Sequence, residues 1–309
     1  MILFSSPKPF TPETLPVQIS AIRSWKQALP QAQVVLFGNE PGLESVCREE
    51  GIQHGGGVET DREGHEILSG IFRKAKDREP HGLQIYLNSD ILLDESAAVA
   101  VATLQSLAGP FLATARRRCL PPWSGPARAG ADLAAFLKSR ENPVRWGSAC
   151  SLDIFLIRDF PVETMPKFRI GHAAWDNWMI FQARCRGIPA IDLSRILRPF
   201  HCDHDYSYSR GNPRPRERNL ALDQRNLELL DGEPKKFHMG YCDHEVAGGQ
   251  VVRRSGAAFT QRQLEFLRIC HPWHRLWILP LRAILRPWVR RWERHTTRIE
   301  DWNQRTPCA

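Results

Sequence analysis

Asn88-Ser89-Asp90 combines residue types that can bind a cation and its phosphate partner, and it directly follows the alternating segment 83–87. A divalent cation held by carboxylate oxygens can neutralise a diphosphate group while keeping coordination sites for phosphate oxygens. Asp90 suits that role because the pattern places it at the end of a strand. The alternative is a simple turn, since asparagine, serine and aspartate all favour turns.

A second group of candidate residues is the sequence Trp175-Asp176-Asn177-Trp178. If Asp176 faces a cleft, its carboxylate can act as a general base and accept the proton of an attacking hydroxyl group. The alternative is a structural N-cap, because aspartate is a good capping residue of a helix. Trp175 or Trp178 can offer an apolar face to a sugar ring, although burial is the commoner fate of a tryptophan.

Two histidines, His201 and His204, stand in a polar segment that follows an extended stretch of the chain. Either imidazole can ligate a metal ion or bind a diphosphate. Cys202 lies between them, and Cys242 and His244 repeat the Cys-Asp-His string further along the chain. These residues leave a Cys/His zinc site open as an alternative.

The elements that must position these residues alternate between strand and helix. Hydrophobic periodicity predicts strands at 2–4, 33–37, 83–87, 111–115, 149–157 and 188–193, and helices at about 12–29, 40–50, 64–77, 95–107, 171–186, 216–230 and 259–270. Segments 51–58, 116–130 and 198–215 are predicted to be irregular. The alternation predicts an α/β fold with a mostly parallel central sheet flanked by helices. In such sheets ligands bind at the carboxyl ends of strands, where Asp90 falls.

Length and composition predict a catalytic domain over residues 1–215 and a helical C-terminal extension over 216–309. The 309 residues are 42% hydrophobic and 25% charged, as in an ordinary globular protein with a packed core. The eight cysteines are scattered, which favours a reducing compartment over a disulfide scaffold. Because no signal peptide and no apolar stretch of about 20 residues is found, we expect a cytoplasmic protein.

Most of the net charge of +8 lies in the C-terminal tail, where 273–309 holds eight arginines and three acidic residues. Tryptophans recur at helical spacing among arginines over 271–296. This profile is typical of an amphipathic segment on an anionic membrane surface, here at the inner face of the membrane. A helix docked on the catalytic domain is the alternative. No nucleic-acid partner is expected, because the charge is confined to this tail and no binding motif is found.

Taken together, Tyr-Leu-Asn-Ser-Asp-Ile-Leu-Leu at 86–93, Trp-Asp-Asn-Trp at 175–178 and His-Cys-Asp-His-Asp-Tyr-Ser at 201–207 resemble a group within the glycosyltransferase-A fold. This fold defines the nucleotide-diphospho-sugar transferase superfamily. Each motif is short, so their order and spacing carry the resemblance, which covers roughly residues 1–210. Asn88 departs from the family pattern, where an aspartate is more usual.

The resemblance implies roles for several residues. Mn²⁺ or Mg²⁺ would be bound by Asn88 and Asp90, completed by His201 or His204, and Asp176 would be the base of an inverting enzyme. The implied donor-binding residues are Ser5, Ser6, Pro7, Asn39, Arg62, His65, Asn88, Ser89 and Asp90. The implied acceptor-binding residues are Trp175, Asn177 and Trp178.

The expected function is therefore the metal-assisted transfer of a sugar from a nucleoside-diphosphate sugar to a hydroxyl group of a saccharide or lipid-linked acceptor. One alternative is a nucleotidyltransferase that makes the sugar nucleotide. Against it, the first loop lacks the glycine-rich, Lys/Arg-bearing stretch that nucleoside triphosphate chemistry would use. The other alternative is a non-catalytic adaptor with a Cys/His zinc site.

Overall fold

The computed structural model describes residues 1–123, 125–139, 145–202, 220–230, 237–270 and 280. His204 and nearly all of the tail segment 271–296 lie outside the described residues, so the predictions for them stay predictions. Each helix in the described part of the chain is too short or too polar to span a lipid bilayer.

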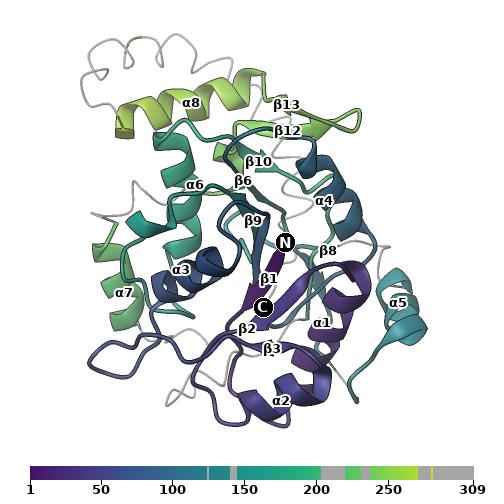
Figure 1. Cartoon of the computed structure of the whole chain (residues 1–309). Helices are drawn as coiled ribbons and strands as arrows, with labels where there is room; N and C mark the ends of the chain where they lie inside the picture. The colour runs from purple at the N-terminus through teal and green to yellow at the C-terminus, as the bar shows by residue number, and fades with distance from the viewer. Residues whose placement is uncertain (124, 140–144, 203–219, 231–236, 271–279, 281–309) are drawn as a thin grey trace.

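The centre of the molecule is a nine-stranded sheet (Figure 1). Its strands are β1 (Ile2–Ser5), β2 (Gln33–Leu36), β3 (Gln53–His54), β4 (Gln84–Leu87), β6 (Phe111–Thr114), β9 (Ile154–Arg158), β10 (Ala190–Asp192), β12 (His244–Ala247) and β13 (Gln250–Arg253). Their order is β13-β12-β10-β6-β9-β4-β1-β2-β3. Only β9 and β13 run antiparallel to their neighbours. The prediction of an α/β fold with a mostly parallel sheet is therefore confirmed.

Helices cover both faces of this sheet, as Figure 1 shows with the sheet between two helical layers. The described helices are α1 (Leu15–Ala28), α2 (Leu43–Glu50), α3 (Leu68–Arg78), α4 (Ser96–Gln105), α5 (Gly130–Ser139), α6 (Trp175–Cys185), α7 (Leu220–Glu228) and α8 (Ala257–Cys270), with short 3-10 turns at Val162–Thr164 and Met239–Tyr241. Alternate strand residues divide between two cores, as a period of two requires. Leu3 and Ile85 join α1, α2, α4 and α5, whereas Phe4 and Tyr86 join α3 and α6.

A second, four-stranded sheet packs beside the first and carries His201. It consists of β5 (Ile91–Leu92), β7 (Arg118–Leu120), β8 (Arg145–Trp146) and β11 (Phe200–Cys202), in the order β5-β11-β7-β8. Two of these strands fall in segments that we expected to be irregular. Strands of three residues are too short to show the alternation on which a prediction depends.

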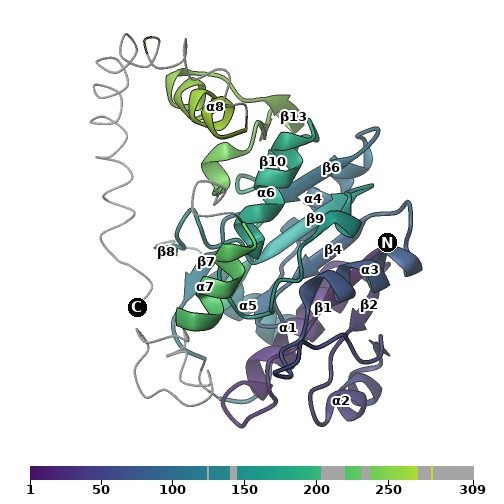
Figure 2. The ribbon, with the colours of Figure 1, turned by 90° about the vertical axis from the view of Figure 1, so that its left-hand side faces the viewer.

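Several boundaries differ from the prediction for local reasons. α3 begins at Leu68 instead of residue 64, because Gly64 turns with φ of 85° and Glu66 forms a β-bridge with Thr60. The helical extension expected after residue 215 also contains two strands, β12 and β13, which extend the central sheet. Figure 2 shows α8 and α2 at opposite ends of this sheet.

Candidate functional site

The candidate site lies at the edge where β1 and β4 end and β9 begins. Phe4 pairs with Tyr86 in the parallel register of β1 and β4, and Leu87 pairs with Ile154 in the antiparallel register of β4 and β9. The loops after β1 and β4 and the residue before β9 therefore meet at one edge of the sheet. This is the edge at which α/β proteins bind ligands.

Asp90 is the buried carboxylate of this edge, with 1% of its surface exposed. Its Oδ2 forms an ion pair with the ammonium group of Lys8 and lies 3.3 Å from His201 Nε2. His201 reaches this position because β11 pairs with β5, which places His201 opposite Ile91. The structure thus brings together Asp90 and His201, which the sequence analysis had grouped, and adds Lys8, which it had missed.

Lys8 is held in place through its backbone. Gln18, fully buried on α1, accepts from Lys8 N at 2.9 Å and donates to Lys8 O at 3.2 Å. Lys8 N also donates to Ser89 Oγ at 3.3 Å. The ammonium group is consequently fixed above Asp90, while 22% of the Lys8 side chain stays exposed. The available sequence signal was a single basic residue in the loop that follows the first strand.

Asn88 belongs to a second polar network. Its Nδ2 donates to Asp153 Oδ1 at 2.8 Å, and its Oδ1 accepts from the Tyr86 hydroxyl at 3.3 Å. Arg117 Nη1 binds the other oxygen of Asp153 at 3.0 Å. Asp153 was not predicted, because its role depends on the pairing of β4 with β9, which the sequence pattern does not reveal. The network explains the asparagine at position 88, since an aspartate would face the carboxylate of Asp153.

Tyr86 marks the point on which the acidic residues converge. Burial raises the pKa of its hydroxyl above the usual value, and the charges of Asp153, Asp90, Asp176 and Glu66 raise it further. Four carboxylates from four separate segments therefore act on one buried phenol. Asp90 and Asp176, 86 positions apart in the sequence, share this region of the fold.

Asp176 occupies the first turn of α6, where its Oδ1 accepts from Asn177 N at 2.8 Å. The N-cap residue of α6 is Ala174, so Asp176 is not the N-cap, although its carboxylate satisfies one N–H group of the first turn. Ala174 has φ of 88°, an unusual conformation for a residue other than glycine. The strained Ala174 sets the direction in which the helix leaves the loop, and hence the place of Asp176.

Helix α7 fixes the loop in front of α6. Asn226, almost fully buried, donates to the carbonyl oxygens of Arg169 and Ala173, both at 3.1 Å, and accepts from Arg169 N at 3.0 Å. Asp223 Oδ1 accepts from Ala173 N at 2.9 Å. These contacts tie the loop to α7 and thereby hold the start of α6, where Asp176 lies.

The three residues expected to bind an acceptor are all buried. Trp175 packs against Tyr86 with ring centroids 5.2 Å apart, and Trp178 packs against Phe168 at 5.8 Å. Asn177 Nδ2 donates to the carbonyl oxygen of Phe237 at 2.7 Å. Packing and hydrogen bonding account for Trp175, Asn177 and Trp178, and the geometry does not support a contact with an acceptor.

Glu66 joins the ends of β1 and β2. Its two carboxylate oxygens accept from Ser6 Oγ at 2.9 Å and from Asn39 N at 2.7 Å. Ser5 and Pro7 on either side of Ser6 are buried, which leaves little of either for a ligand. Glu66 had not been predicted, because the sequence analysis placed it inside a helix.

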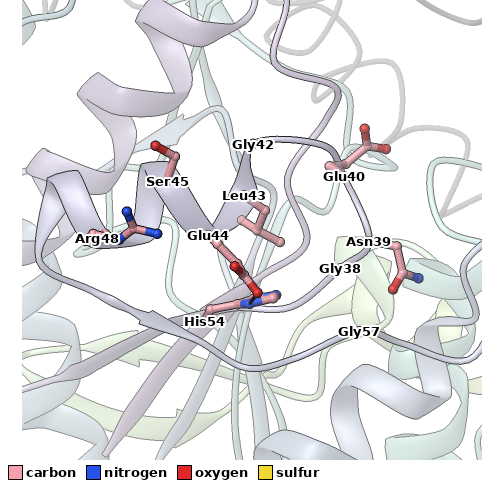
Figure 3. A pocket seen from close by; sticks show the side chains of 10 residues that line it. All are labelled: Gly38, Asn39, Glu40, Gly42, Leu43, Glu44, Ser45, Arg48, His54 and Gly57. Atoms are coloured by element: carbon pink, nitrogen blue, oxygen red, sulfur yellow. Dashed lines mark ion pairs between the residues drawn. The ribbon is translucent and has the colours of Figure 1, made fainter.

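An open pocket of about 500 Å³ lies next to Asn39 (Figure 3). It is lined by Gly38, Asn39, Glu40, Gly42, Leu43, Glu44, Ser45, Arg48, His54 and Gly57. In Figure 3, Glu44 and His54 point toward one another, and their side chains are 3.7 Å apart. The pocket has the size of a small-molecule site. It opens at the ends of β2 and β3, on the edge that also carries Lys8 and Asp90.

The donor set around Asp90 does not fit a resident divalent cation. Mg²⁺ and Mn²⁺ require carboxylate and other oxygen ligands, but Asp90 Oδ2 already binds the Lys8 ammonium and Asn88 Oδ1 accepts from Tyr86. Over the described ranges, Asp90 and His201 belong to no group of three or more His, Cys, Asp or Glu side chains within metal-binding reach. This geometry does not support the metal role predicted for Asn88 and Asp90.

Asp61, Glu63 and His65 form the one group of potential metal ligands found in the described part of the chain. Both carboxylates are already paired with arginine, Asp61 with Arg169 and Glu63 with Arg225. Burial opposes ionisation of Asp61, but hydrogen bonds from the backbone of His65 and from Arg169 lower its pKa. The two carboxylates therefore stabilise the turn through their arginine partners, and this geometry does not favour a metal site there.

Arg62 lies on the same turn, exposed to solvent. Nothing in the described contacts joins it to Asp90 or to the pocket. The diphosphate-binding role that the resemblance implied for Arg62 and His65 stays a prediction.

The Cys/His zinc alternative finds no support. Cys202 lies on β11 of the smaller sheet, whereas Cys242 lies between the Met239–Tyr241 turn and β12 of the large sheet. Burial raises the pKa of the Cys242 thiol, which disfavours the thiolate that zinc requires. His244 pairs instead with Asp243, with its Nδ1 3.0 Å from Oδ1.

No family model matches the sequence, and no curated protein matches it. Among solved structures, the chain is similar to the mannosyltransferase PcManGT from Pyrobaculum calidifontis in complex with GDP-Man and Mn²⁺, at 12% identity and a TM-score of 0.43, over 92% of this chain and 73% of that one. It is also similar to glucosyl-3-phosphoglycerate synthase from Mycobacterium tuberculosis in complex with Mn²⁺ and UDP, at 12% identity and a TM-score of 0.40, over 75% and 79% of the two chains.

A third similar structure is a CMP:2-keto-3-deoxy-manno-octonic acid synthetase complexed with CTP. It has 11% identity and a TM-score of 0.35, over 74% of this chain and 98% of that one. Similarities this distant leave the function to be inferred from the residues of this chain.

Proposed function

We propose that this protein is a glycosyltransferase that moves a sugar from a nucleoside-diphosphate sugar to a hydroxyl group of an acceptor. The observation that carries the proposal is the cluster of Lys8, Asp90 and His201 at the ends of β1 and β4, beside an open pocket. Asp176 lies in the first turn of α6, where its neighbour Trp175 packs against Tyr86 of β4. These groups match what glycosyl transfer requires. The Lys8 cation can bind a diphosphate leaving group, the buried carboxylate of Asp90 can orient a donor, and the carboxylate of Asp176 can deprotonate an acceptor.

The arrangement of the strands supports one orientation of the donor. The pocket opens at β2, and Asp90 follows β4, with β1 between them. Neighbouring strands are about 4.8 Å apart, so the two places are separated by roughly 10 Å, which a nucleoside diphosphate can span. The nucleoside would lie in the pocket near Asn39 and His54, and the diphosphate would lie near Lys8.

Asp176 is the proposed general base of an inverting reaction. Its carboxylate would take the proton of the acceptor hydroxyl as that oxygen attacks the anomeric carbon. The bond from that carbon to the diphosphate breaks, and the negative charge of the leaving group develops where the Lys8 ammonium stands. Asn177 N donates to one oxygen of Asp176 and holds the carboxylate in a fixed orientation.

Lys8 also gives a specific reason to test the nucleotidyltransferase alternative. A basic side chain after the first strand is what binding of a nucleoside triphosphate requires, and the loop does carry one. The glycine-rich stretch is absent from residues 5–14, so we expect no preference for a triphosphate over the matching diphosphate. A lipid-linked acceptor, and membrane binding through 271–296, stay predictions.

The experiment uses the full chain, a panel of UDP-, GDP-, CDP-, dTDP- and ADP-sugars with saccharide acceptors, and measures release of the nucleoside diphosphate. For Asp176→Asn we expect transfer to fall by roughly 10²- to 10⁴-fold while donor affinity changes little, because general base catalysis contributes about that much. Asp132→Asn, an exposed substitution on α5, is the matched control. Unchanged transfer in Asp176→Asn would refute the assignment, and no binding of any nucleotide by wild type would refute the proposed function.

A further inference from the structure

Lys8 occupies the position at which a metal ion would neutralise Asp90. Its ammonium group forms an ion pair with Asp90 Oδ2, the oxygen that also lies 3.3 Å from His201 Nε2. A divalent cation on the same oxygen would have to displace Lys8, and two cations there would repel one another. The resemblance to metal-dependent enzymes and the contacts of this chain therefore disagree.

Buried side chains hold Lys8 in place, unlike a lysine that makes a contact on the surface. Asp90 is 1% exposed and Gln18 is fully buried, and both bind Lys8. Gln18 binds the backbone of Lys8 on both its N–H and its carbonyl group, and Ser89 Oγ accepts from the same N–H. The lysine is therefore fixed at both ends before any ligand arrives, as a preorganised charge should be.

We infer that Lys8 replaces the divalent cation, so that this protein binds the diphosphate of its donor through an ammonium group and without a metal. An ammonium carries three N–H donors and can bridge Asp90 and a phosphate oxygen. Asp90 then serves to position Lys8 instead of ligating a metal. The inference depends on the proposed function, since it concerns how that donor is bound.

Neutralising each of the two partners in turn separates this inference from metal binding. Neutralising Asp90 leaves the Lys8 cation in place, so a lysine site keeps part of its affinity for a diphosphate, whereas a metal site loses its carboxylate ligand. Neutralising Lys8 has the opposite effect on diphosphate affinity. A lysine site loses its cation, whereas a metal site keeps Asp90 as a ligand. The variant that loses more diphosphate affinity is therefore Lys8→Met if lysine binds the diphosphate, and Asp90→Asn if a metal does.

The experiment is calorimetric titration of the full chain with UDP, GDP, CDP, dTDP and ADP, in EDTA and in Mn²⁺. We expect one nucleotide to bind equally well in both conditions. Lys8→Met should weaken it by roughly 10- to 100-fold, the effect of losing a hydrogen bond to a charged group, and Lys8→Arg should recover part of the loss. Asp90→Asn should weaken it less than Lys8→Met does, and equally in EDTA and in Mn²⁺, because the amide oxygen still accepts a hydrogen bond from the Lys8 ammonium.

Lys26→Met, which removes an exposed lysine from the far end of α1, is the matched control and should bind as wild type does. Circular dichroism of each variant separates a lost contact from a lost fold. Binding that requires Mn²⁺, disappears in Asp90→Asn and persists in Lys8→Met would overturn the inference and leave the proposed function standing. A flat response to every nucleotide in both conditions would overturn both.

Discussion

Asn88→Asp restores the residue that is usual in the resembled family, and we expect it to destabilise this protein. Asn88 Nδ2 donates to Asp153 Oδ1 at 2.8 Å, so the new carboxylate would face that oxygen. Two unit charges about 4 Å apart repel by roughly 4 kcal/mol at an effective dielectric constant of 20. Arg117, bound to the other oxygen of Asp153, offsets part of this repulsion. We expect a net loss of about 2 to 4 kcal/mol in the free energy of unfolding at pH 7.

The loss should depend on pH with a definite sign. Repulsion by the neighbouring carboxylate raises the folded-state pKa of the new aspartate at position 88 above its unfolded value. The destabilisation is complete above the folded pKa and is relieved as the pH falls through it, at up to about 1.4 kcal/mol per pH unit. Urea unfolding of wild type and Asn88→Asp between pH 5 and 8 measures the difference directly.

The double variant Asn88→Asp/Asp153→Asn is the control for this prediction. It exchanges donor and acceptor between the two positions and should recover part of the stability, a positive coupling in a double-mutant cycle. Equal stability of wild type and Asn88→Asp at pH 7, or a difference that does not change with pH, would refute the proposed network around Asn88.

Three further substitutions test the scaffold of the site. Ala174→Gly should raise the free energy of unfolding by about 1 kcal/mol, since glycine adopts a φ of 88° without strain. A melting temperature below that of wild type would show that Ala174 is not strained. Gln18→Ala removes both hydrogen bonds that fix the Lys8 backbone, so nucleotide affinity measured by calorimetry should fall several-fold. An unchanged affinity would show that these two hydrogen bonds are not needed to position Lys8. Ser45→Trp fills the pocket beside α2 and should weaken nucleotide binding by at least tenfold with an unchanged melting temperature. Binding equal to that of wild type would exclude the pocket as the nucleoside site.

The alternation of strands and helices was predictable because each face of the large sheet is buried under helices. β1 and β2 stand out as apolar runs and β4 as an alternating segment, and the residues that end them lie at the ligand edge as expected. Asp90 was placed correctly for that reason. The sequence also grouped it with His201, although the antiparallel pairing of β5 and β11 that joins them spans only two residues of each strand.

The remaining site residues depend on contacts that a sequence pattern does not contain. Asp153 meets Asn88 only because β9 runs antiparallel to β4, and periodicity does not specify strand direction. Glu66 was assigned to a helix, although a glycine turn delays that helix by four residues. Lys8 looks like an ordinary loop lysine until its ion pair with Asp90 is known.

The most direct test of donor binding at this edge is a crystal structure of the full chain with the nucleoside diphosphate that binds most tightly. We expect the base in the pocket between α2 and His54, and a phosphate oxygen about 3 Å from Lys8 Nζ with the ion pair to Asp90 retained. A nucleotide bound away from the edge formed by β1, β2 and β4 would contradict the proposed function. A metal ion on Asp90 in place of the Lys8 ammonium would contradict the role assigned to Lys8.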